Sequence, residues 1–181
     1  IIVLMGKPQG GTRPIALMPM IYRVWSKIRK PMLDQWCRDN HGPWDAAIAG
    51  SSALRAALIQ LLHDEVACLT GEAVAKIVWD IEKFYDSIDI VMLVERVFER
   101  NYPIGCLALG LQMHMAPRVI QAYDHYVMVG RPSNAIIAGC TQSNNLARVM
   151  LHKVLQNTRE RIPSDWTAFW RSFVDDVSQI S

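Results

Sequence analysis

The stretch VWDIEKFYDS, residues 78–87, ends an apolar run on an acid, Asp80. Apolar and polar side chains alternate up to Asp80, which predicts a short strand that closes there. Far along the chain, SFVDDVS at residues 172–178 places Asp175 and Asp176 in an equally apolar setting. An ionised carboxylate is costly to bury unless it is paired or binds a metal ion. We therefore expect the two stretches to form two halves of one cation site.

Three carboxylates in this arrangement suit catalysis by two metal ions. Divalent ions held about 4 Å apart by acids from different strands clamp the attacking and leaving oxygens of a phosphate. Asp80 meets Asp175 and Asp176 if its strand lies beside a terminal hairpin that turns at this pair. Neighbouring side chains of a strand face opposite ways, so we expect Asp175 to contact both ions and Asp176 to be more peripheral. A lone Asp80 would be an ordinary strand-end residue, but the three acids together favour the metal site.

The basic side chains are concentrated at the beginning of the chain. Nineteen Lys and Arg against seventeen acids give a net charge of only +2. Residues 1–38 hold a single acid, Asp34, and seven of the bases: Lys7, Arg13, Arg23, Lys27, Arg29, Lys30 and Arg38. This segment should carry a local positive field suited to phosphates. Between residues 40 and 100 the acids outnumber the bases, so we expect no uniformly basic face.

Cysteine spacing and hydropathy indicate a soluble, intracellular protein with no membrane partner. The four cysteines lie far apart without a C-x-x-C pair, which argues against a zinc knuckle and a disulfide framework and favours a reducing compartment. No apolar run approaches the roughly 18 residues of a membrane span, and the opening IIVLM is too short for a signal peptide. Nucleus and cytoplasm are not distinguished. Because the first residue is Ile1, we expect a piece of a longer chain.

Apolar periodicity and turn residues predict a mixture of strands and helices without strict βαβ alternation. This favours an α+β domain with an antiparallel sheet. The expected elements are a hairpin over 1–17, a helix over 20–37 with a kink or break at Pro31, a helix from Ser51 or Ser52 to about Gly71, a strand over 74–80, a helix capped by Asp86, Ser87 or Asp89, a helix over 104–115, a hairpin and a following strand over 118–139, a helix after Ser143, and a tight hairpin over 167–181.

Each expected helix has an apolar stripe that we expect to face the core. The positions are Ile21, Val24, Trp25, Ile28 and Met32 in the first helix; Leu54, Leu58, Leu61, Leu62 and Val66 in the second; Val91, Val94, Val97 and Phe98 in the third; and Ala147, Leu151 and Val154 in the last. Trp25 and Trp36 lie in the basic segment, where stacking on template bases is an alternative to core packing.

Four motifs in fixed order resemble a known family. KPQGGTRPI, WDIEKFYDSI, GCTQSNNLA and FVDD are similar to the fingers and palm motifs of reverse transcriptases, particularly those of retrotransposons and group II introns. The likeness runs from Lys7 to Asp176; each motif alone is weak, and the ordered set is specific. It implies a right-hand polymerase with fingers and an antiparallel palm sheet flanked by helices, and without a thumb. Residues 1–73 would form the fingers with part of the palm helices, and 74–181 the palm, in one incomplete catalytic domain.

The resemblance also implies roles for individual residues. Asp80, Asp175 and Asp176 would be the catalytic ligands of Mg²⁺, or of Mn²⁺ in its place. Tyr85 would be an aromatic gate whose ring leaves no room for a 2′-hydroxyl; similar RNA-dependent RNA polymerases carry an Asp at that spacing. Lys7 and Arg13 would hold the nucleotide triphosphate, and Gln142 would lie near its sugar. Thr141 and Ser143 depart from the usual G-x-P-Q-G motif, which puts the fit around nucleotide and template in doubt.

The resulting hypothesis is an RNA-directed DNA polymerase, a nucleotidyltransferase acting on an RNA template, a DNA or RNA primer and dNTPs. A thumb and other domains of a longer polyprotein would be its partners, so we expect the 181-residue chain alone to extend primers weakly or not at all. Two alternatives remain: an RNA-dependent RNA polymerase, and a polymerase-like RNA-binding scaffold without catalysis. Simpler interpretations also remain open: Asp86 and Asp89 as helix caps, Tyr85 as a core aromatic, Lys7 and Arg13 as solvated turn residues, and Gln142 as a helix-start residue.

Overall fold

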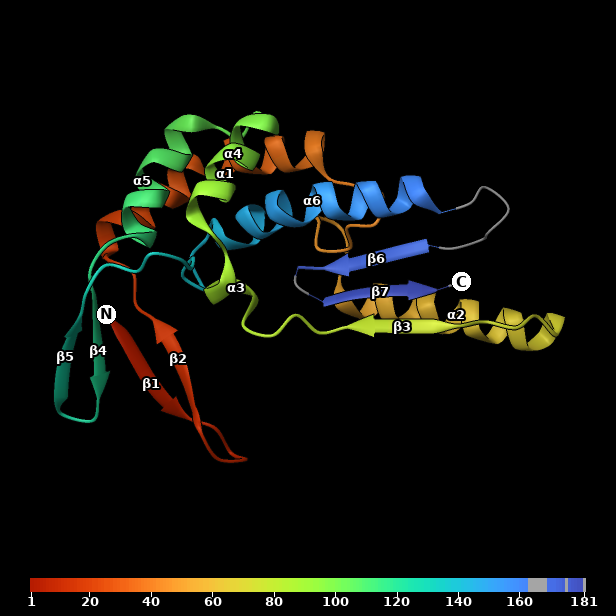
Figure 1. Ribbon diagram of the computed structural model, residues 1–181, viewed down its shortest axis with the longest axis horizontal. Helices are drawn as coiled ribbons and strands as arrows, with labels where there is room; N and C mark the ends of the chain where they lie inside the picture. The colour runs from red at the N-terminus through yellow and green to blue at the C-terminus, as the bar shows by residue number, and fades with distance from the viewer. Residues whose placement is uncertain (163–168, 175, 181) are drawn as a thin grey trace. The chain divides into compact units, whose positions relative to one another are not determined.

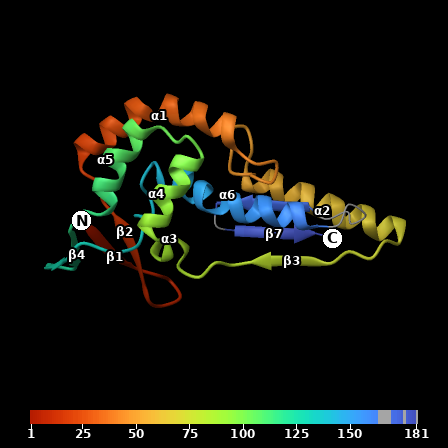
Figure 2. The same cartoon turned by 45° about the horizontal axis from the view of Figure 1, so that its top comes forward.

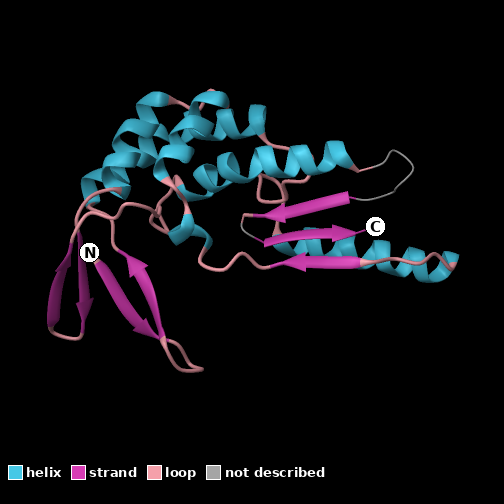
Figure 3. Ribbon diagram, viewed as in Figure 1, coloured by secondary structure: helices cyan, strands magenta, loops and turns pink. Residues whose placement is uncertain are grey.

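The structure, a computed structural model, describes residues 1–162, 169–174 and 176–180. Strands and helices are mixed, as the sequence predicts (Figure 1; Figure 3). In chain order the elements are β1 (Ile2–Gly6), β2 (Thr12–Ala16), α1 (Met20–Asn40), α2 (Ala53–Thr70), β3 (Lys76–Trp79), α3 (Phe84–Ser87), α4 (Ile90–Glu99), α5 (Ile104–His114), β4 (Arg118–Ala122), β5 (His125–Val129), α6 (Ser143–Arg161), β6 (Phe169–Phe173) and β7 (Asp176–Ile180). Among the described helices, none is long and apolar enough to cross a membrane.

The chain divides into two compact units, each built from two segments of sequence. Unit 1 combines Ile1–Trp36 with Lys83–Leu146, and unit 2 combines Cys37–Glu82 with Ala147–Ser181. The contacts discussed below lie within one unit or the other. These units do not coincide with a division after residue 73, so that division of fingers from palm stays a prediction.

The sheet of unit 1 joins two hairpins in the order β2-β1-β4-β5. Both hairpins are antiparallel and confirm the sequence prediction. They are joined by a parallel pairing of β1 with β4 that covers only Ile2↔Ile120 and Val3↔Gln121. The sequence did not predict this junction, because the pairing connects distant segments and no local turn encodes it. The expectation of an antiparallel sheet is therefore incomplete for this unit.

The sheet of unit 2 is antiparallel in the order β3-β7-β6, with α2 and α6 running alongside its strands (Figure 1; Figure 2). The predicted strand over 74–80 is present as the shorter β3, and the predicted terminal hairpin is present as β6 and β7. Phe173 pairs with Asp176, so the hairpin turns at the two residues between them. Trp44, Leu151, Leu155 and Val177 form an apolar cluster of this unit.

The helix ends follow the capping rules that the sequence suggested. Ser52 caps α2 by accepting a hydrogen bond from the Arg55 amide, and Gly71 ends the helix in a left-handed conformation at φ 72°. Asp89 caps α4 by accepting from the Met92 amide at 2.8 Å, whereas Asp86 lies inside the short α3. The predicted break at Pro31 is wrong, because α1 continues through it.

The buried faces of three helices differ from the expected stripes. In α1 the buried residues are Tyr22, Ser26, Leu33 and Trp36, while Ile21, Val24 and Ile28 are exposed. In α2 only Ala67 is buried, and Leu54, Leu58, Leu61, Leu62 and Val66 are exposed. In α4 Ile90, Leu93 and Val97 are buried, and Val91 and Phe98 are exposed. In α6 the stripe fails at Val154, which is 60% exposed, whereas Leu155 is buried.

The physical reason is clearest in α1, which has two adjacent apolar stripes. Trp36 donates its indole N–H to the Arg100 carbonyl at 3.0 Å and packs edge-on against Tyr102 at 4.8 Å. Aromatic side chains bury more area than Ile or Val, and their polar groups need a partner when buried. The face carrying Tyr22 and Trp36 therefore turns inward at the expense of the aliphatic stripe.

The strand expected after Gly130-Arg131-Pro132 is absent from the described residues. The Ala135 and Ile136 amides instead donate to the carbonyls of Ile88 and Tyr85, each at 2.9 Å. The segment thus satisfies its backbone groups on the connection between α3 and α4. Ala135 also has a positive φ of 88°, which is incompatible with a regular strand.

Candidate active site

The predicted metal-binding acids belong to the end of the unit 2 sheet. The last printed pair of the β3–β7 ladder is Trp79↔Val177, so the same register carried one residue further sets Asp80 opposite Asp176. Opposed positions in an antiparallel pair have Cα atoms about 5 Å apart. Asp80 is exposed, Asp175 lies outside the described residues, and for Asp176 only the backbone is described. The register brings the two chain segments together as expected, while the metal-ligand roles stay predictions.

The turn of the β6–β7 hairpin is conformationally unusual. Val174 adopts a left-handed backbone at φ 61°, which a β-branched residue rarely does. Such conformations cost about 1–3 kcal/mol and persist only where the surroundings enforce them. Here the flanking strands pair in register up to Phe173 and Asp176. The turn that carries the predicted acids is therefore held in place by the sheet.

A buried ion pair supports this sheet from the loop over residues 42–47. Ser172 of β6 donates its amide to the Trp44 carbonyl at 2.9 Å and accepts from the Ala46 amide at 2.8 Å. Between these two contacts Asp45 forms an ion pair with Arg148 of α6, and their side chains are only 5% and 8% exposed. Arg148 also donates to the Ala47 carbonyl at 2.9 Å. Sequence reasoning missed this pair, because its members lie a hundred residues apart in unrelated patterns.

Tyr85, the predicted sugar gate, is anchored within unit 1. It lies in α3, its hydroxyl donates to Asn144 Oδ1 at 3.1 Å, and its ring meets Phe84 edge-on at 5.4 Å. Its carbonyl accepts from the Ile136 amide. The ring is half-buried. Both the backbone and the hydroxyl of Tyr85 are thus fixed, although selection between sugars stays a prediction.

Gln142, the predicted nucleotide contact, is fully buried immediately before α6. Its amide oxygen accepts from the Tyr102 hydroxyl at 3.1 Å, and its amide nitrogen lies 3.1 Å from the Cys106 carbonyl and 3.4 Å from the Tyr22 hydroxyl. A Cβ at Gly110 would lie 3.0 Å from this amide. In this structure Gln142 therefore joins α1, α5 and the start of α6, and its role toward a nucleotide stays a prediction.

Two cysteines belong to the same buried region. The Tyr22 hydroxyl lies 3.1 Å from Cys140 Sγ, and burial raises the pKa of Tyr22 well above its ordinary value, with the Cys140 hydrogen bond adding to the effect. Burial likewise raises the pKa of the Cys106 thiol. All four cysteines are free thiols, as the sequence predicts. We call Tyr22, Tyr102, Cys106, Cys140 and Gln142 the Gln142 network.

A buried histidine holds the segment that leads to this network. His114, at the end of α5, accepts the Ile137 amide on Nδ1 at 2.9 Å, so its neutral form carries the proton on Nε2. Within the described residues Nε2 has no partner. Burial lowers the pKa of His114 to about 4, and the nearby Arg118 lowers it further in the same direction. Ser143 adds a second tie by donating to the Ile137 carbonyl at 2.5 Å.

Lys7 and Arg13 lie on the hairpin formed by β1 and β2. Lys7 is exposed in a turn that its own backbone closes, donating to the Gly11 carbonyl and accepting from the Gly10 amide at 3.0 Å each. Gly10 and Gly11 both have positive φ, which allows the tight tip. Arg13 pairs with Met5 in register, and nothing of its side chain is described. No contact is described between Lys7 and Tyr85 or Gln142.

Comparison with known proteins decides the family. Residues 5–181 match the family described as reverse transcriptase (RNA-dependent DNA polymerase). The chain belongs to the reverse transcriptase family. No curated protein matches the sequence.

The fold of this reverse transcriptase chain is similar to that of telomerases. For apo telomerase from Candida tropicalis, truncated from its C-terminal domain, the TM-score is 0.65 at 13% identity, covering 99% of this chain and 43% of the other. For telomerase from Candida albicans in complex with a TWJ fragment of telomeric RNA, the TM-score is 0.57 at 13% identity, covering 99% and 37%. The chain thus spans less than half of either telomerase chain.

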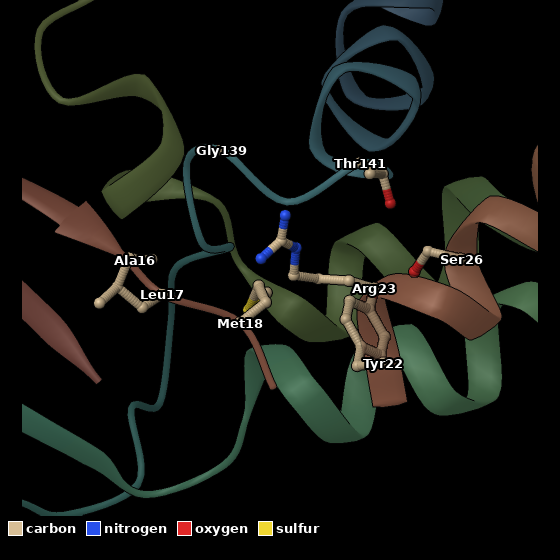
Figure 4. Close-up of a pocket in the computed structure, with 8 residues that line it drawn as sticks. All are labelled: Ala16, Leu17, Met18, Tyr22, Arg23, Ser26, Gly139 and Thr141. Carbon is tan, nitrogen blue, oxygen red and sulfur yellow. The ribbon is translucent and has the colours of Figure 1, made fainter. Parts of the chain in front are cut away.

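A cavity of about 280 Å³ in unit 1 of the reverse transcriptase chain fronts the loop that carries Gln142 (Figure 4). Its lining residues are Ala16, Leu17, Met18, Tyr22, Arg23, Ser26, Gly139 and Thr141. The Arg23 guanidinium extends between Met18 and the Gly139–Thr141 loop. A concave site with a cation and hydroxyl groups suits a phosphate-bearing ligand. The polar residues behind it, above all Tyr22, carry no sequence motif that would have singled them out.

Proposed function

We propose that this chain is the fingers and palm portion of an RNA-directed DNA polymerase, which transfers a nucleotide from a dNTP to a primer 3′-hydroxyl. Family membership over residues 5–181 supports the reaction class. The observation that carries the site is the β3–β7 register, which sets Asp80 opposite the hairpin of Asp175 and Asp176. Residues 1–73 are proposed as fingers with part of the palm helices, and 74–181 as palm.

The donor set at this sheet end fits divalent metal ions. Carboxylate oxygens are the ligands that Mg²⁺ prefers, and the exposed Asp80 stands where the register meets the hairpin. Asp80, Asp175 and Asp176 would hold Mg²⁺, with Mn²⁺ as a substitute. When bound, such ions lower the pKa of the attacking hydroxyl and neutralise charge on the leaving pyrophosphate.

The remaining site residues would bind and select the nucleotide. Lys7 and Arg13 on the β1–β2 hairpin would place positive charge on the triphosphate. The ring of Tyr85 would exclude a 2′-hydroxyl sterically, which favours DNA synthesis over RNA synthesis. The hydrogen bond from Tyr85 to Asn144 supports this role, because a fixed ring discriminates better than a mobile one.

The template, primer and domain partners complete the proposal. The Candida albicans telomerase was solved with an RNA fragment, which supports an RNA template for the present chain, with a DNA or RNA primer. A thumb and other domains of a longer protein would grip the duplex, so the 181-residue chain alone should extend primers weakly or not at all. We place the protein inside the cell, in nucleus or cytoplasm.

Primer extension tests the proposal directly. In the full-length protein that contains this chain, Asp80→Asn should lower dNTP incorporation on an RNA template about a hundredfold or more, because a metal ligand is lost. Asp86→Asn is the matched control, since this exposed acid lies in α3 away from the predicted ligands. Full activity of Asp80→Asn would refute the assignment.

Metal binding separates an enzyme from an inactive scaffold. Calorimetry of the 181-residue chain with Mg²⁺ or Mn²⁺ should show binding in the wild type and in Asp86→Asn, and weaker binding in Asp175→Asn. Identical titrations for all three proteins would favour the scaffold alternative.

A further inference from the structure

A larger groove in unit 1 follows α1 beyond the small cavity at Gly139. Its volume is about 570 Å³, and it is lined by Met20, Arg23, Val24, Ser26, Lys27, Lys30, Leu33 and Asp34 of α1, with Thr141 and Asn145 on the opposite wall. Arg23, Ser26 and Thr141 line both hollows. The groove and the cavity therefore adjoin each other along one face of the helix.

Three cations are spaced regularly along this groove. Arg23, Lys27 and Lys30 stand at helical intervals of four and three residues, which place them on one face. With a rise of 1.5 Å per residue, successive cations are about 6 Å and 4.5 Å apart along the axis. Such a row can follow a chain of phosphates, whereas a single small anion needs only one of its members.

Most of this charge is free to act on a ligand. Within the described part of the chain, Arg23 and Lys27 have no ion-pair partner. Lys30 pairs with Asp34 at 2.6 Å, but the two side chains are 65% and 41% exposed, so water screens the pair and its strength is small. The groove thus offers net positive charge, reduced at one end by Asp34.

The other lining groups suit the remaining parts of a nucleotide chain. Ser26, Thr141 and Asn145 supply hydrogen-bonding groups, and Met20, Val24 and Leu33 supply apolar surface. Single-stranded nucleic acids bind where a positively charged groove follows the backbone and apolar or aromatic surfaces receive sugars and bases. An acidic protein segment would use the cations but leave the apolar floor without a defined partner.

We propose that the α1 groove, from Arg23 to Lys30, binds the phosphate backbone of a single strand of nucleic acid. The inference rests on the proposed function for the choice of RNA as the strand, and it assigns the strand to residues outside the predicted catalytic set. Asp34 limits the affinity by neutralising Lys30. None of these residues is proposed to take part in the chemistry.

Fluorescence anisotropy tests the groove without any polymerisation. The probe is a fluorescein-labelled 15-nucleotide unstructured RNA, titrated with the 181-residue chain in EDTA at several salt concentrations. Arg23→Ala and Lys27→Ala should each weaken binding about three- to tenfold, since each removes a charge-assisted contact. Replacing Arg23, Lys27 and Lys30 together should reduce the slope of log K against log salt by about 2, at about 0.7 for each lost phosphate contact of a single strand.

The matched controls are on the same helix. Arg29→Ala removes the same charge but does not line the groove, so it should change affinity less than twofold. Asp34→Asn should strengthen binding about two- to threefold by releasing Lys30. Circular dichroism and urea unfolding confirm that each variant is folded, so that a lost fold is not counted as lost binding.

Several results would overturn the inference. These are no RNA binding by the wild type at low salt, an unchanged slope in the triple variant, or an equal loss in Arg29→Ala, which would indicate a diffuse charge effect. Preference for duplex RNA would refute the single-strand assignment, and equal competition by polyglutamate would reassign the groove to acidic proteins. Because no dNTP or metal is present, a polymerase that fails to extend primers contradicts the proposed function alone.

Discussion

Two buried polar networks support the two groups of predicted site residues, and they differ in charge. Behind the unit 2 sheet, Asp45 and Arg148 form an ion pair beside Ser172 of β6. In unit 1, the Gln142 network is built from amide, hydroxyl, thiol and carbonyl groups. A buried ion pair has a large desolvation cost that each partner offsets for the other, whereas a neutral network loses less when one member is removed. The comparison therefore predicts unequal responses to substitution.

The ionic support should be the most sensitive to loss of one partner. Arg148→Met leaves the Asp45 carboxylate buried without its cation, which should lower the free energy of unfolding by about 3–5 kcal/mol. Urea unfolding measures it. Arg159→Met, an exposed position of the same helix, is the control and should change stability by less than about 0.5 kcal/mol. Asp45→Leu combined with Arg148→Met should recover much of the loss, and a single-variant effect below about 1 kcal/mol would contradict the role given to the pair.

The neutral support of unit 1 should respond to acid through His114. Its pKa is about 4 in the folded chain against an ordinary 6.5, so below pH 6.5 the unfolded state binds the proton and the folded state does not. The stability is fully present above pH 6.5 and is lost as pH falls toward 4. At about 1.4 kcal/mol for each pH unit between these values, the loss is about 3 kcal/mol.

Urea unfolding at pH 7.5, 5.5 and 4.5 checks this dependence. His114→Gln should flatten it, because glutamine does not titrate and its amide oxygen can still accept the Ile137 amide. His125→Gln, at an exposed position of β5, should leave it unchanged. Equal pH dependence in wild type and His114→Gln would contradict the interpretation.

Removing the centre of the Gln142 network should have a smaller effect. Gln142→Met keeps the side-chain length but leaves the Tyr102 hydroxyl and the Cys106 carbonyl without this partner, at a cost of about 2 kcal/mol in unfolding free energy. Adding Tyr102→Phe should restore part of the loss, since one unpaired hydroxyl disappears. Gln156→Met, exposed on α6, is the control. A neutral effect of Gln142→Met would show that the burial of this amide contributes little.

The smallest expected effect concerns the Tyr85 ring. Asn144→Ala removes the acceptor of its hydroxyl, and a less constrained ring should lower the preference for dNTPs over rNTPs about three- to tenfold, the equivalent of about 1 kcal/mol. Single-nucleotide incorporation by the full-length protein measures the ratio, with Asn157→Ala on the exposed part of α6 as control. An unchanged ratio, together with normal dNTP incorporation, would separate Asn144 from sugar selection.

Local signals in the sequence were sufficient for most elements. The hairpins, the caps at Ser52 and Asp89 and the αL residue at Gly71 depend on neighbouring residues, and each is present. The order of the four motifs was enough to identify the family. The β3–β7 pairing was expected only because Asp80 needed partners.

What the sequence could not supply is long-range. Which stripe of α1 is buried depends on Trp36 finding the Arg100 carbonyl and the Tyr102 ring. The parallel junction of β1 with β4 and the Asp45–Arg148 pair likewise join segments with no shared pattern. The burial of Gln142 follows from Tyr22 and Tyr102, which no motif marks.

Gly110 shows how a polar network restricts evolution at a position that takes no part in it chemically. Alanine is ordinarily the better residue in the middle of a helix such as α5, by about 1 kcal/mol. A methyl group here would press within 3.0 Å of the Gln142 amide, whose three hydrogen bonds leave it no freedom to withdraw. The usual gain in helix stability is thereby reversed, and variation at this position is open only to sequences that change Gln142 as well.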